Sequence, residues 1–322
     1  MKDAFAIAAQ YGVVPVINIP NVESAVPLAD ALIAGGLPLI EVTMRNPNSL
    51  EALREIKKER SQMLAGAGTI LTVELAEQAI EAGADFIVAP GFNPDVVKYC
   101  LEKGVPVLPG CSTATEIEAA RKLGLRLFKF FPSEQLGGVK TMKEYCGPYR
   151  DIKFVATSGI NLQNLPTYMN FEGVAAVGGS FMAPAALVAA GEWEEITKLC
   201  KKAVETALGF HLMHIGINGL DEEDGAANAK RFAEIFGMQY RPGNRSDFAG
   251  TVLESCKVKF PGEKGHIAIG TYSVERAVAY LAAKGIEIRD EFLKKDAQGR
   301  MVAAYLKEEI GGFAIHLLRS NG

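Results

Sequence analysis

The sequence has few cysteines, and none of them forms a C-x-x-C pair. The five cysteines, at positions 100, 111, 146, 200 and 256, are odd in number and widely spaced. This pattern indicates reduced thiols and excludes a disulfide framework. The sequence also lacks an apolar run long enough to span a bilayer, and no apolar segment near Met1 leads to a small-residue cleavage site. These absences predict a cytoplasmic protein that is not held in a membrane.

The chain also lacks an excess of positive charge. Its formal net charge at pH 7 is -4, and 22% of its residues are charged and 48% hydrophobic. This composition is typical of a soluble globular protein, and it gives no electrostatic reason to expect nucleic acid as a partner. A length of 322 residues exceeds one typical core, so we expect about two domains.

Short apolar runs alternate with segments of helical period in the first part of the chain. Eight strand-like runs occur at 13–19, 39–44, 64–69, 86–91, 105–110, 127–132, 153–157 and 173–178. Helical segments occur at 22–34, 49–58, 73–82, 94–103, 115–123, 162–169 and 196–208. Strands that are apolar on both faces and separated by helices pair in parallel, so eight such units predict a (β/α)8 TIM barrel over residues 1–205. A doubly wound open sheet is the alternative, but no G-x-G-x-x-G opens the first helix.

One lysine lies inside an aromatic run, Leu127-Phe128-Lys129-Phe130-Phe131-Pro132. Burying an ammonium group without a partner is costly, and burial favours the neutral amine. A neutral lysine can attack a carbonyl carbon and form a Schiff base, so Lys129 is a candidate nucleophile. Two other interpretations stay open: a strand lysine that reaches solvent, and a buried structural ion pair between Lys129 and Glu41.

Polar side chains gather at the C-terminal ends of the predicted strands, where the active site of such a barrel lies. They are Glu41, Thr43 and Arg45 at the second strand, Thr69 at the third, Thr157 and Ser158 at the seventh, and Ser180 after the eighth. A carboxylate, an arginine and a lysine in such positions are costly to bury unless they serve a ligand.

The order of several short motifs resembles one enzyme family. The motifs are Glu41-Val42-Thr43-Met44-Arg45, Gly66-Ala67-Gly68-Thr69, Ala89-Pro90-Gly91, Pro109-Gly110, Phe128-Lys129-Phe130-Phe131-Pro132, Thr157-Ser158-Gly159-Ile160 and Gly178-Gly179-Ser180. Over residues 1–205 the sequence is similar to the 2-keto-3-deoxy-6-phosphogluconate (KDPG) aldolase and 4-hydroxy-2-oxoglutarate (KHG) aldolase family. The resemblance implies a class I aldolase that cleaves a 6-phosphorylated 2-keto-3-deoxy sugar acid to pyruvate and an aldehyde such as glyceraldehyde 3-phosphate. It also implies a homotrimer that needs no cofactor beyond the lysine.

The resemblance implies a role for each matching residue. Lys129 would form the Schiff base with the keto acid, and Glu41 would shuttle protons. Arg45 and Thr69 would hold the pyruvate carboxylate, which suits the planar fork of an arginine. Pro90 and Phe131 would line the pocket. The distal phosphate would lie against Thr157, Ser158, Gly159, Gly178, Gly179 and Ser180.

Two positions depart from the family pattern. Ser158 stands where the family more often has glycine, and Asn46 stands where threonine is frequent. These differences leave open whether the substrate is the phosphorylated acid or the shorter 4-hydroxy-2-oxoglutarate. Two other functions remain as alternatives, namely a non-catalytic barrel that binds a sugar acid beside a sensor domain, and a phosphate-binding isomerase or synthase.

Residues 210–322 have a different composition and contain all four histidines of the chain. Strand-like runs that begin at His214 and His266 each precede a helical segment, 226–236 and 274–284. Further strand-like runs occur at 248–253, 257–260, 302–306 and 313–318. The pattern resembles the paired βαβββ modules of the glyoxalase and vicinal-oxygen-chelate superfamily, which would form a smaller α+β domain.

This second resemblance implies a divalent metal, held by residues from the first and last strand of each module. His214, His266 and His316 match three of these places, and the fourth falls near Lys257–Lys259 or at Glu254. Three imidazoles can bind zinc or a similar ion. Half-buried histidines that bond to backbone groups are the alternative.

Overall fold

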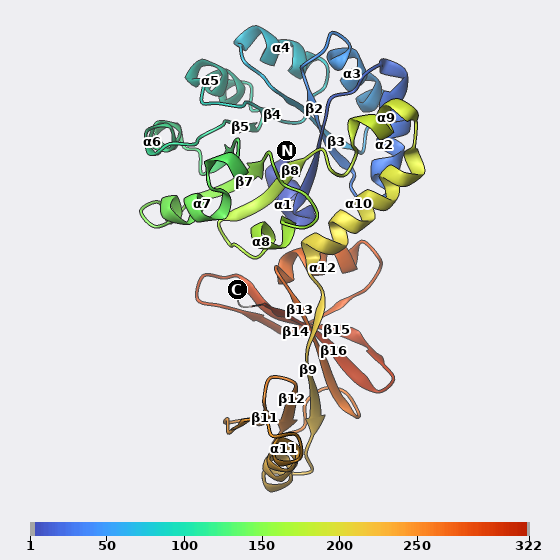
Figure 1. Cartoon of the computed structure of the whole chain (residues 1–322), viewed down its shortest axis with the longest axis vertical. Coiled ribbons are helices and arrows are strands. Elements are labelled where there is room, and N and C mark those ends of the chain that lie inside the picture. Colours follow the sequence, from blue (N-terminus) through green and yellow to red (C-terminus); the bar gives the residue numbers. More distant parts are fainter. Residues whose placement is uncertain (1–3, 321–322) are drawn as a thin grey trace. The chain divides into compact units, whose positions relative to one another are not determined.

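The protein is described by a computed structural model that covers residues 4–320 and contains two compact units. The units divide between Ala207 and Leu208, and Figure 1 labels their helices and strands. In the described part of the chain, no helix has the length and apolar character that a bilayer span requires.

The first unit is a parallel barrel of eight strands. They are β1 (Val13–Ile17), β2 (Leu39–Thr43), β3 (Leu64–Gly68), β4 (Ile87–Val88), β5 (Val107–Leu108), β6 (Leu127–Phe130), β7 (Lys153–Thr157) and β8 (Val174–Gly179). The strand order is β5-β4-β3-β2-β1-β8-β7-β6. A parallel bridge between Gly110 and Lys129 joins the two ends of this sheet, so the ring is nearly closed. The predicted TIM barrel is confirmed.

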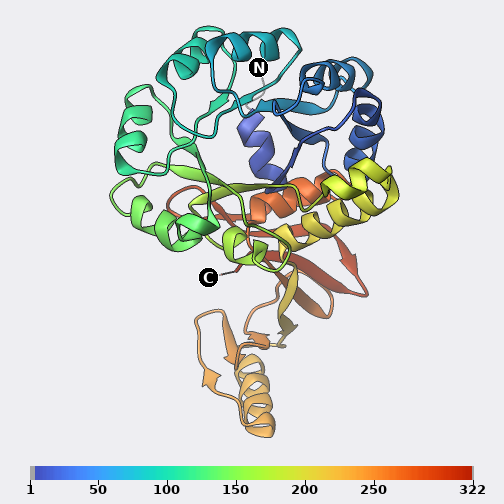
Figure 2. The ribbon, with the colours of Figure 1, turned by 45° about the horizontal axis from the view of Figure 1, so that its top comes forward.

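Helices surround the ring of strands, as Figure 2 shows. They are α2 (Ala25–Ala34), α3 (Ser49–Glu59), α4 (Val73–Glu81), α5 (Pro94–Glu102), α6 (Ala114–Lys122), α7 (Gly138–Cys146), α8 (Leu165–Met169), α9 (Ala185–Ala190) and α10 (Trp193–Leu208). Side chains of Thr72, Asn93 and Thr113 accept hydrogen bonds from the first turns of α4, α5 and α6. These caps satisfy backbone N–H groups that a helix start leaves free, and they fix where the helices begin.

The N-terminal helix α1 (Ala4–Tyr11) covers one end of the barrel. Its Phe5 ring lies 5.6 Å from the ring of Phe86, which directly precedes β4. This is the end at which the strands begin. The opposite end, where the polar residues lie, stays open to a ligand.

The second unit is a mixed eight-stranded sheet made of two βαβββ modules. The first module contains β9 (His211–Asn218), α11 (Glu222–Phe236), β10 (Tyr240–Arg241), β11 (Ser246–Ala249) and β12 (Leu253–Cys256). The second contains β13 (Gly265–Thr271), α12 (Val274–Ala282), β14 (Ile288–Lys295), β15 (Met301–Ile310) and β16 (Phe313–Arg319). The order is β10-β11-β12-β9-β13-β16-β15-β14, and β9 and β13 pair antiparallel at the centre. The predicted paired modules are therefore present.

Two of the predicted strands in this unit are wrong. The run 248–253 spans a turn, because β11 ends at Ala249, Gly250 has a φ of 60°, and β12 begins only at Leu253. The run 257–260 is not a strand. The turn glycine lies inside an apolar run, so the hydrophobic pattern hid the hairpin and shifted the expected last strand of the module past its true position.

Candidate functional sites

Lys129 and Glu41 lie together inside the barrel. Lys129 Nζ is 3.3 Å from Glu41 Oε1, and the two side chains are only 7% and 5% exposed. The ammonium group also lies 5.5 Å from the centre of the Phe131 ring. The solvent-exposed interpretation of Lys129 is therefore wrong. The lysine is a buried amine next to a carboxylate, which is the arrangement that nucleophilic and acid–base chemistry requires.

The neighbouring strand β3 is shaped to receive the Glu41 carboxylate. A Cβ atom at Gly68 would lie 2.1 Å from Glu41 Oε1, so only glycine leaves room for the carboxylate in this position. The next residue, Thr69, has a φ of 62°, a conformation that is uncommon for a residue with a side chain. This turn brings Thr69 Oγ1 within 3.3 Å of Arg45 Nε, which donates a hydrogen bond to it.

A cavity of about 350 Å³ opens at the C-terminal ends of the strands. Most of the predicted ligand-binding residues line it, namely Arg45, Phe131, Thr157, Ser158, Gly159, Gly178, Gly179 and Ser180. Lys129, Glu41, Thr69 and Pro90 are not among its lining residues. Lys129 and Glu41 lie deeper, beside Phe131, and Thr69 is joined to the lining through Arg45. Pro90 lies beside Gly110, where a Cβ atom would approach the Pro90 carbonyl oxygen to 2.0 Å.

Ser158 has a left-handed backbone conformation of the kind that favours glycine. Its φ is 88°, and that of Gly159 is 77°, so the turn after β7 keeps a left-handed path despite the side chain. Ser158 Oγ lies 3.4 Å from Gln135 Oε1, to which it donates a hydrogen bond. The turn therefore accommodates the serine side chain in a conformation that is usual for glycine.

Asn18 is a cavity residue that the sequence patterns did not reveal. It follows β1 and lines the same cavity. Asn46 Nδ2 donates hydrogen bonds to Asn18 Oδ1 and to the Ile19 carbonyl oxygen, both at 2.7 Å. The available signal was position alone, because Asn18 lies near the end of a strand-like run just as Arg45 follows another.

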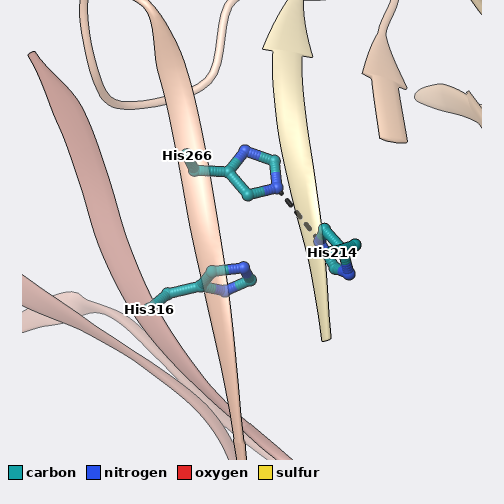
Figure 3. A group of neighbouring side chains, drawn as sticks. All are labelled: His214, His266 and His316. Atoms are coloured by element: carbon teal, nitrogen blue, oxygen red, sulfur yellow. Dashed lines mark hydrogen bonds between the residues drawn. The ribbon is translucent and has the colours of Figure 1, made fainter. Parts of the chain in front are cut away.

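The second unit brings three histidines and one glutamate together from four strands. His214 on β9, His266 on β13 and His316 on β16 have ligand atoms within 4.8 Å of one another, and Figure 3 shows their rings converging. Glu254 on β12 completes the group, because its Oε2 lies 2.9 Å from His214 Nε2 and 3.3 Å from His266 Nε2. His214 Nε2 and His266 Nε2 are 3.2 Å apart.

The fourth member of this group is thus Glu254, and the expectation of Lys257–Lys259 was wrong. Lys257 Nζ instead bonds to Asp247 Oδ1 at 2.9 Å and to the Gly243 carbonyl oxygen at 2.9 Å. The error follows from the missed hairpin, which places the last strand of the module at Leu253–Cys256. Each of the first and last strands of the two modules then contributes one side chain.

The group is buried, and several of its nitrogen atoms have no hydrogen-bond partner. Among the described residues these are both ring nitrogens of His316 and Nδ1 of His266. Burial is the main cause that lowers the pKa of His316, to about 3, so its imidazole is neutral. Burial would raise the pKa of Glu254, but hydrogen bonds from His214, His266 and Ser246 outweigh it and hold the pKa well below its usual range. The neutral imidazole of His316 and the ionised carboxylate of Glu254 are in the protonation states that a divalent cation needs.

The first unit has the architecture of a barrel enzyme, because its polar cavity lies at the C-terminal ends of parallel strands. Residues 6–199 match the family described as KDPG and KHG aldolase, and the chain belongs to this family. The 2-dehydro-3-deoxy-phosphogluconate aldolase of Treponema pallidum is 49% identical over 193 residues, which are 60% of this chain and 92% of that protein. The KHG/KDPG aldolase of Escherichia coli is 41% identical over 195 residues, or 61% of this chain and 92% of that protein.

Solved structures agree with this assignment. The KDPG aldolase of Legionella pneumophila, captured with pyruvate as a covalent carbinolamine intermediate, is 34% identical with a TM-score of 0.61, over 63% of this chain and 98% of that chain. The 2-keto-3-deoxy-6-phosphogluconate aldolase of Zymomonas mobilis with 3-phosphoglycerate is 38% identical with a TM-score of 0.59, over 63% and 96%. The first unit is therefore a class I aldolase, a carbon–carbon lyase that acts on keto acids through a Schiff base and without a metal.

Proposed function

We propose that Lys129 is the Schiff-base nucleophile of this aldolase and that its substrate is a 6-phosphorylated 2-keto-3-deoxy sugar acid. The observation that carries the proposal is the 3.3 Å contact between the buried Lys129 amine and the Glu41 carboxylate. The Lys129 nitrogen attacks the C2 carbonyl to give a carbinolamine, and Glu41 supplies the proton with which water leaves. Glu41 then takes the proton of the C4 hydroxyl as the C3–C4 bond breaks. This cleavage releases an aldehyde such as glyceraldehyde 3-phosphate and leaves an enamine on Lys129. Protonation of the enamine at C3 and hydrolysis release pyruvate.

Arg45 and Thr69 are proposed to bind the carboxylate of the keto acid. The hydrogen bond from Arg45 Nε to Thr69 Oγ1 leaves the terminal guanidinium nitrogens available to a carboxylate. Arg45 and Phe131 line the cavity, and Phe131 forms part of its apolar wall, whereas Pro90 is not among the lining residues. This arrangement would orient the keto carbon toward Lys129.

The distal phosphate is proposed to bind the turns after β7 and β8. Thr157, Ser158 and Gly159 line one side of the cavity, and Gly178, Gly179 and Ser180 line the adjacent side. Glycine turns let backbone N–H groups approach an anion closely. The retained φ of 88° at Ser158 supports the longer, phosphorylated substrate over 4-hydroxy-2-oxoglutarate, because the turn keeps its glycine-like path.

For the second unit, we propose a glyoxalase-like domain with a divalent metal held by His214, His266, His316 and Glu254. The buried, unpartnered nitrogens of His316 and His266 support this proposal, since a cation would satisfy them. A bound metal would act as a Lewis acid that polarises a ligand oxygen. The proposal concerns this unit alone, and the aldol cleavage does not depend on it.

We also propose a homotrimer in the cytoplasm. The trimer follows from the family resemblance. The five cysteines are all free thiols, which supports a reducing compartment.

The experiment that tests the barrel proposal is borohydride trapping. Wild-type protein is incubated with pyruvate and borohydride, and the mass of the peptide that contains Lys129 is measured. We expect a stable adduct in the wild type and none in Lys129→Arg, because arginine stays protonated and cannot act as a nucleophile. An adduct on another lysine, or aldol cleavage by the arginine variant, would contradict the assignment.

A further inference from the structure

Asn18 lies at the mouth of the barrel cavity, directly after β1. Val16 on β1 pairs with Glu41 on β2, and side chains two residues apart along a strand point to the same face. Asn18 is therefore expected to point into the barrel on the side of Glu41, and it does line the cavity, together with Arg45. The strand order places β1 between β2 and β8. Asn18 thus stands between the proposed carboxylate site at Arg45 and the proposed phosphate turn after β8.

The hydrogen bonds of Asn46 determine which end of the Asn18 amide is left for a ligand. Asn46 Nδ2 donates at 2.7 Å to the Ile19 carbonyl oxygen, which can only accept. Asn46 Oδ1 accepts from the Asn48 backbone N–H at 2.9 Å, so only one orientation of the Asn46 amide satisfies both contacts. The same Nδ2 donates to Asn18 Oδ1 at 2.7 Å. The oxygen of Asn18 is therefore the end that is bound, and its amino group is the other end.

The Asn18 amino group is a neutral donor, and it makes no hydrogen bond among the residues that the structure describes. The proposed site already supplies Arg45 for the carboxylate and the turns after β7 and β8 for the phosphate. Between these two charged ends, the sugar acid carries hydroxyl groups at C4 and C5. The C4 hydroxyl gives its proton to Glu41 in the proposed cleavage, so the C5 hydroxyl is the group that still lacks a partner.

We infer that Asn18 determines the specificity of the aldolase for a sugar acid with a hydroxyl group at C5, because Asn18 Nδ2 donates a hydrogen bond to that oxygen. Asn46 is the positioning residue that holds the Asn18 amide in this orientation. No bond forms or breaks at C5, so the contact contributes to binding of both the substrate and the transition state. The inference rests on the proposed phosphorylated substrate and names the residue that recognises its middle part.

The test compares 2-keto-3-deoxy-6-phosphogluconate with its 5-deoxy analogue, which lacks only the C5 hydroxyl group. The release of pyruvate from each acid by the full-length protein gives kcat/KM. We expect the wild type to prefer the hydroxylated acid about three- to tenfold, which is the effect of one hydrogen bond between neutral groups. Asn18→Leu keeps the size of the side chain and removes its polar atoms, so it should abolish this preference.

Further variants separate the loss of the donor from a change of shape. Asn18→Ala removes the amide without adding methyl groups, and it should abolish the preference as well. Asn46→Ala leaves Asn18 in place but frees its amide to turn, so the preference should fall, and combining it with Asn18→Leu should cause no further fall. Asn48→Ala is the matched control from the same turn, because it keeps the backbone N–H that bonds to Asn46. It should leave the preference unchanged.

The possible failures are distinguishable. A wild type that releases pyruvate from neither acid would overturn the proposed phosphorylated substrate and this inference together. A wild type that cleaves both acids without preferring the hydroxylated one would overturn the role of Asn18 alone. A preference that survives in both Asn18 variants, or that is lost equally in Asn48→Ala, would do the same. Neither result bears on the nucleophile, because borohydride trapping tests Lys129 separately.

Discussion

Gly68, the last residue of β3, provides the sharpest test of where the Glu41 carboxylate must lie. A Cβ atom at this position would lie 2.1 Å from Glu41 Oε1 and 2.7 Å from its carboxyl carbon. Ordinary non-bonded contact requires the carboxylate to move by at least about 1 Å. A shift of that size would disturb its 3.3 Å contact with Lys129 Nζ.

We expect Gly68→Ala to lower kcat about a hundredfold, because a misplacement of about 1 Å in a reacting group can cost that much. The added methyl group should also lower the free energy of unfolding by about 1–3 kcal/mol through overpacking. Steady-state release of pyruvate from the phosphorylated sugar acid measures kcat, and chemical denaturation measures stability. Gly91→Ala is the matched control, since a Cβ atom at Gly91 meets no atom within 4 Å. It should change kcat by less than about twofold.

A double variant separates crowding of Glu41 from a general loss of structure. Aspartate is one methylene shorter, so Glu41→Asp should be less harmful in the Gly68→Ala background than in the wild type. The two changes would then be non-additive, as expected for residues in contact. The reasoning would be refuted if folded Gly68→Ala kept kcat within about threefold of the wild type. Independent, multiplicative losses would refute it as well.

Three further perturbations test other parts of the chain. Ser180→Ala should lower kcat/KM for the 6-phosphorylated acid about tenfold and leave the unphosphorylated acid unchanged, so an equal loss for both would exclude a phosphate contact there. Ser158→Gly should raise the free energy of unfolding by about 0.5–1 kcal/mol, because it removes the strain of a φ of 88° at some entropic cost; a less stable variant in urea denaturation would contradict this. Burial would raise the pKa of Asp247, but hydrogen bonds from Lys257 and Tyr240 outweigh it and hold the pKa below the usual range of an aspartate. The unfolded chain then binds the proton more readily, so the stabilisation is complete above about pH 5 and is lost as the pH falls through the folded-state pKa. Asp247→Asn should lower stability at pH 7 by about 1–3 kcal/mol and flatten this acid loss, and an equally steep loss in the variant would count against it.

The barrel could be predicted because its strands are apolar on both faces and each is followed by a helix. Helix α7 escaped prediction, because it begins at Gly138 after a second glycine, Gly137, and both have positive φ. A helix start of this kind carries no capping or periodic signal. Strand β14 was missed for a different reason, since charged residues at 289–291 and 294–295 hide its alternation.

Some residues of the candidate sites could likewise be predicted from the sequence, and others could not. Lys129, Glu41 and Arg45 could be found in the sequence because charged residues are conspicuous at the ends of apolar strands. The need for glycine at position 68 could not, because it depends on where a side chain from another strand lies. The sequence left the fourth member of the histidine group open between Lys257–Lys259 and Glu254. The choice depends on the hairpin at Gly250, and the positive φ of this glycine cannot be recognised in a run of apolar residues.

The position of Lys129 at the seam of the barrel has a consequence for how the aldolase site is assembled. Its backbone N–H donates to the Pro109 carbonyl oxygen at 2.9 Å, and its own carbonyl oxygen accepts from the Cys111 N–H at 2.9 Å. The same residue that presents the amine thus joins β6 to the segment that follows β5. Its carboxylate partner Glu41 lies 88 positions earlier in the chain. A nascent barrel that ends before β6 would contain Glu41, Arg45 and Thr69 but not Lys129, the proposed nucleophile, so we expect no aldol cleavage from a chain of that length.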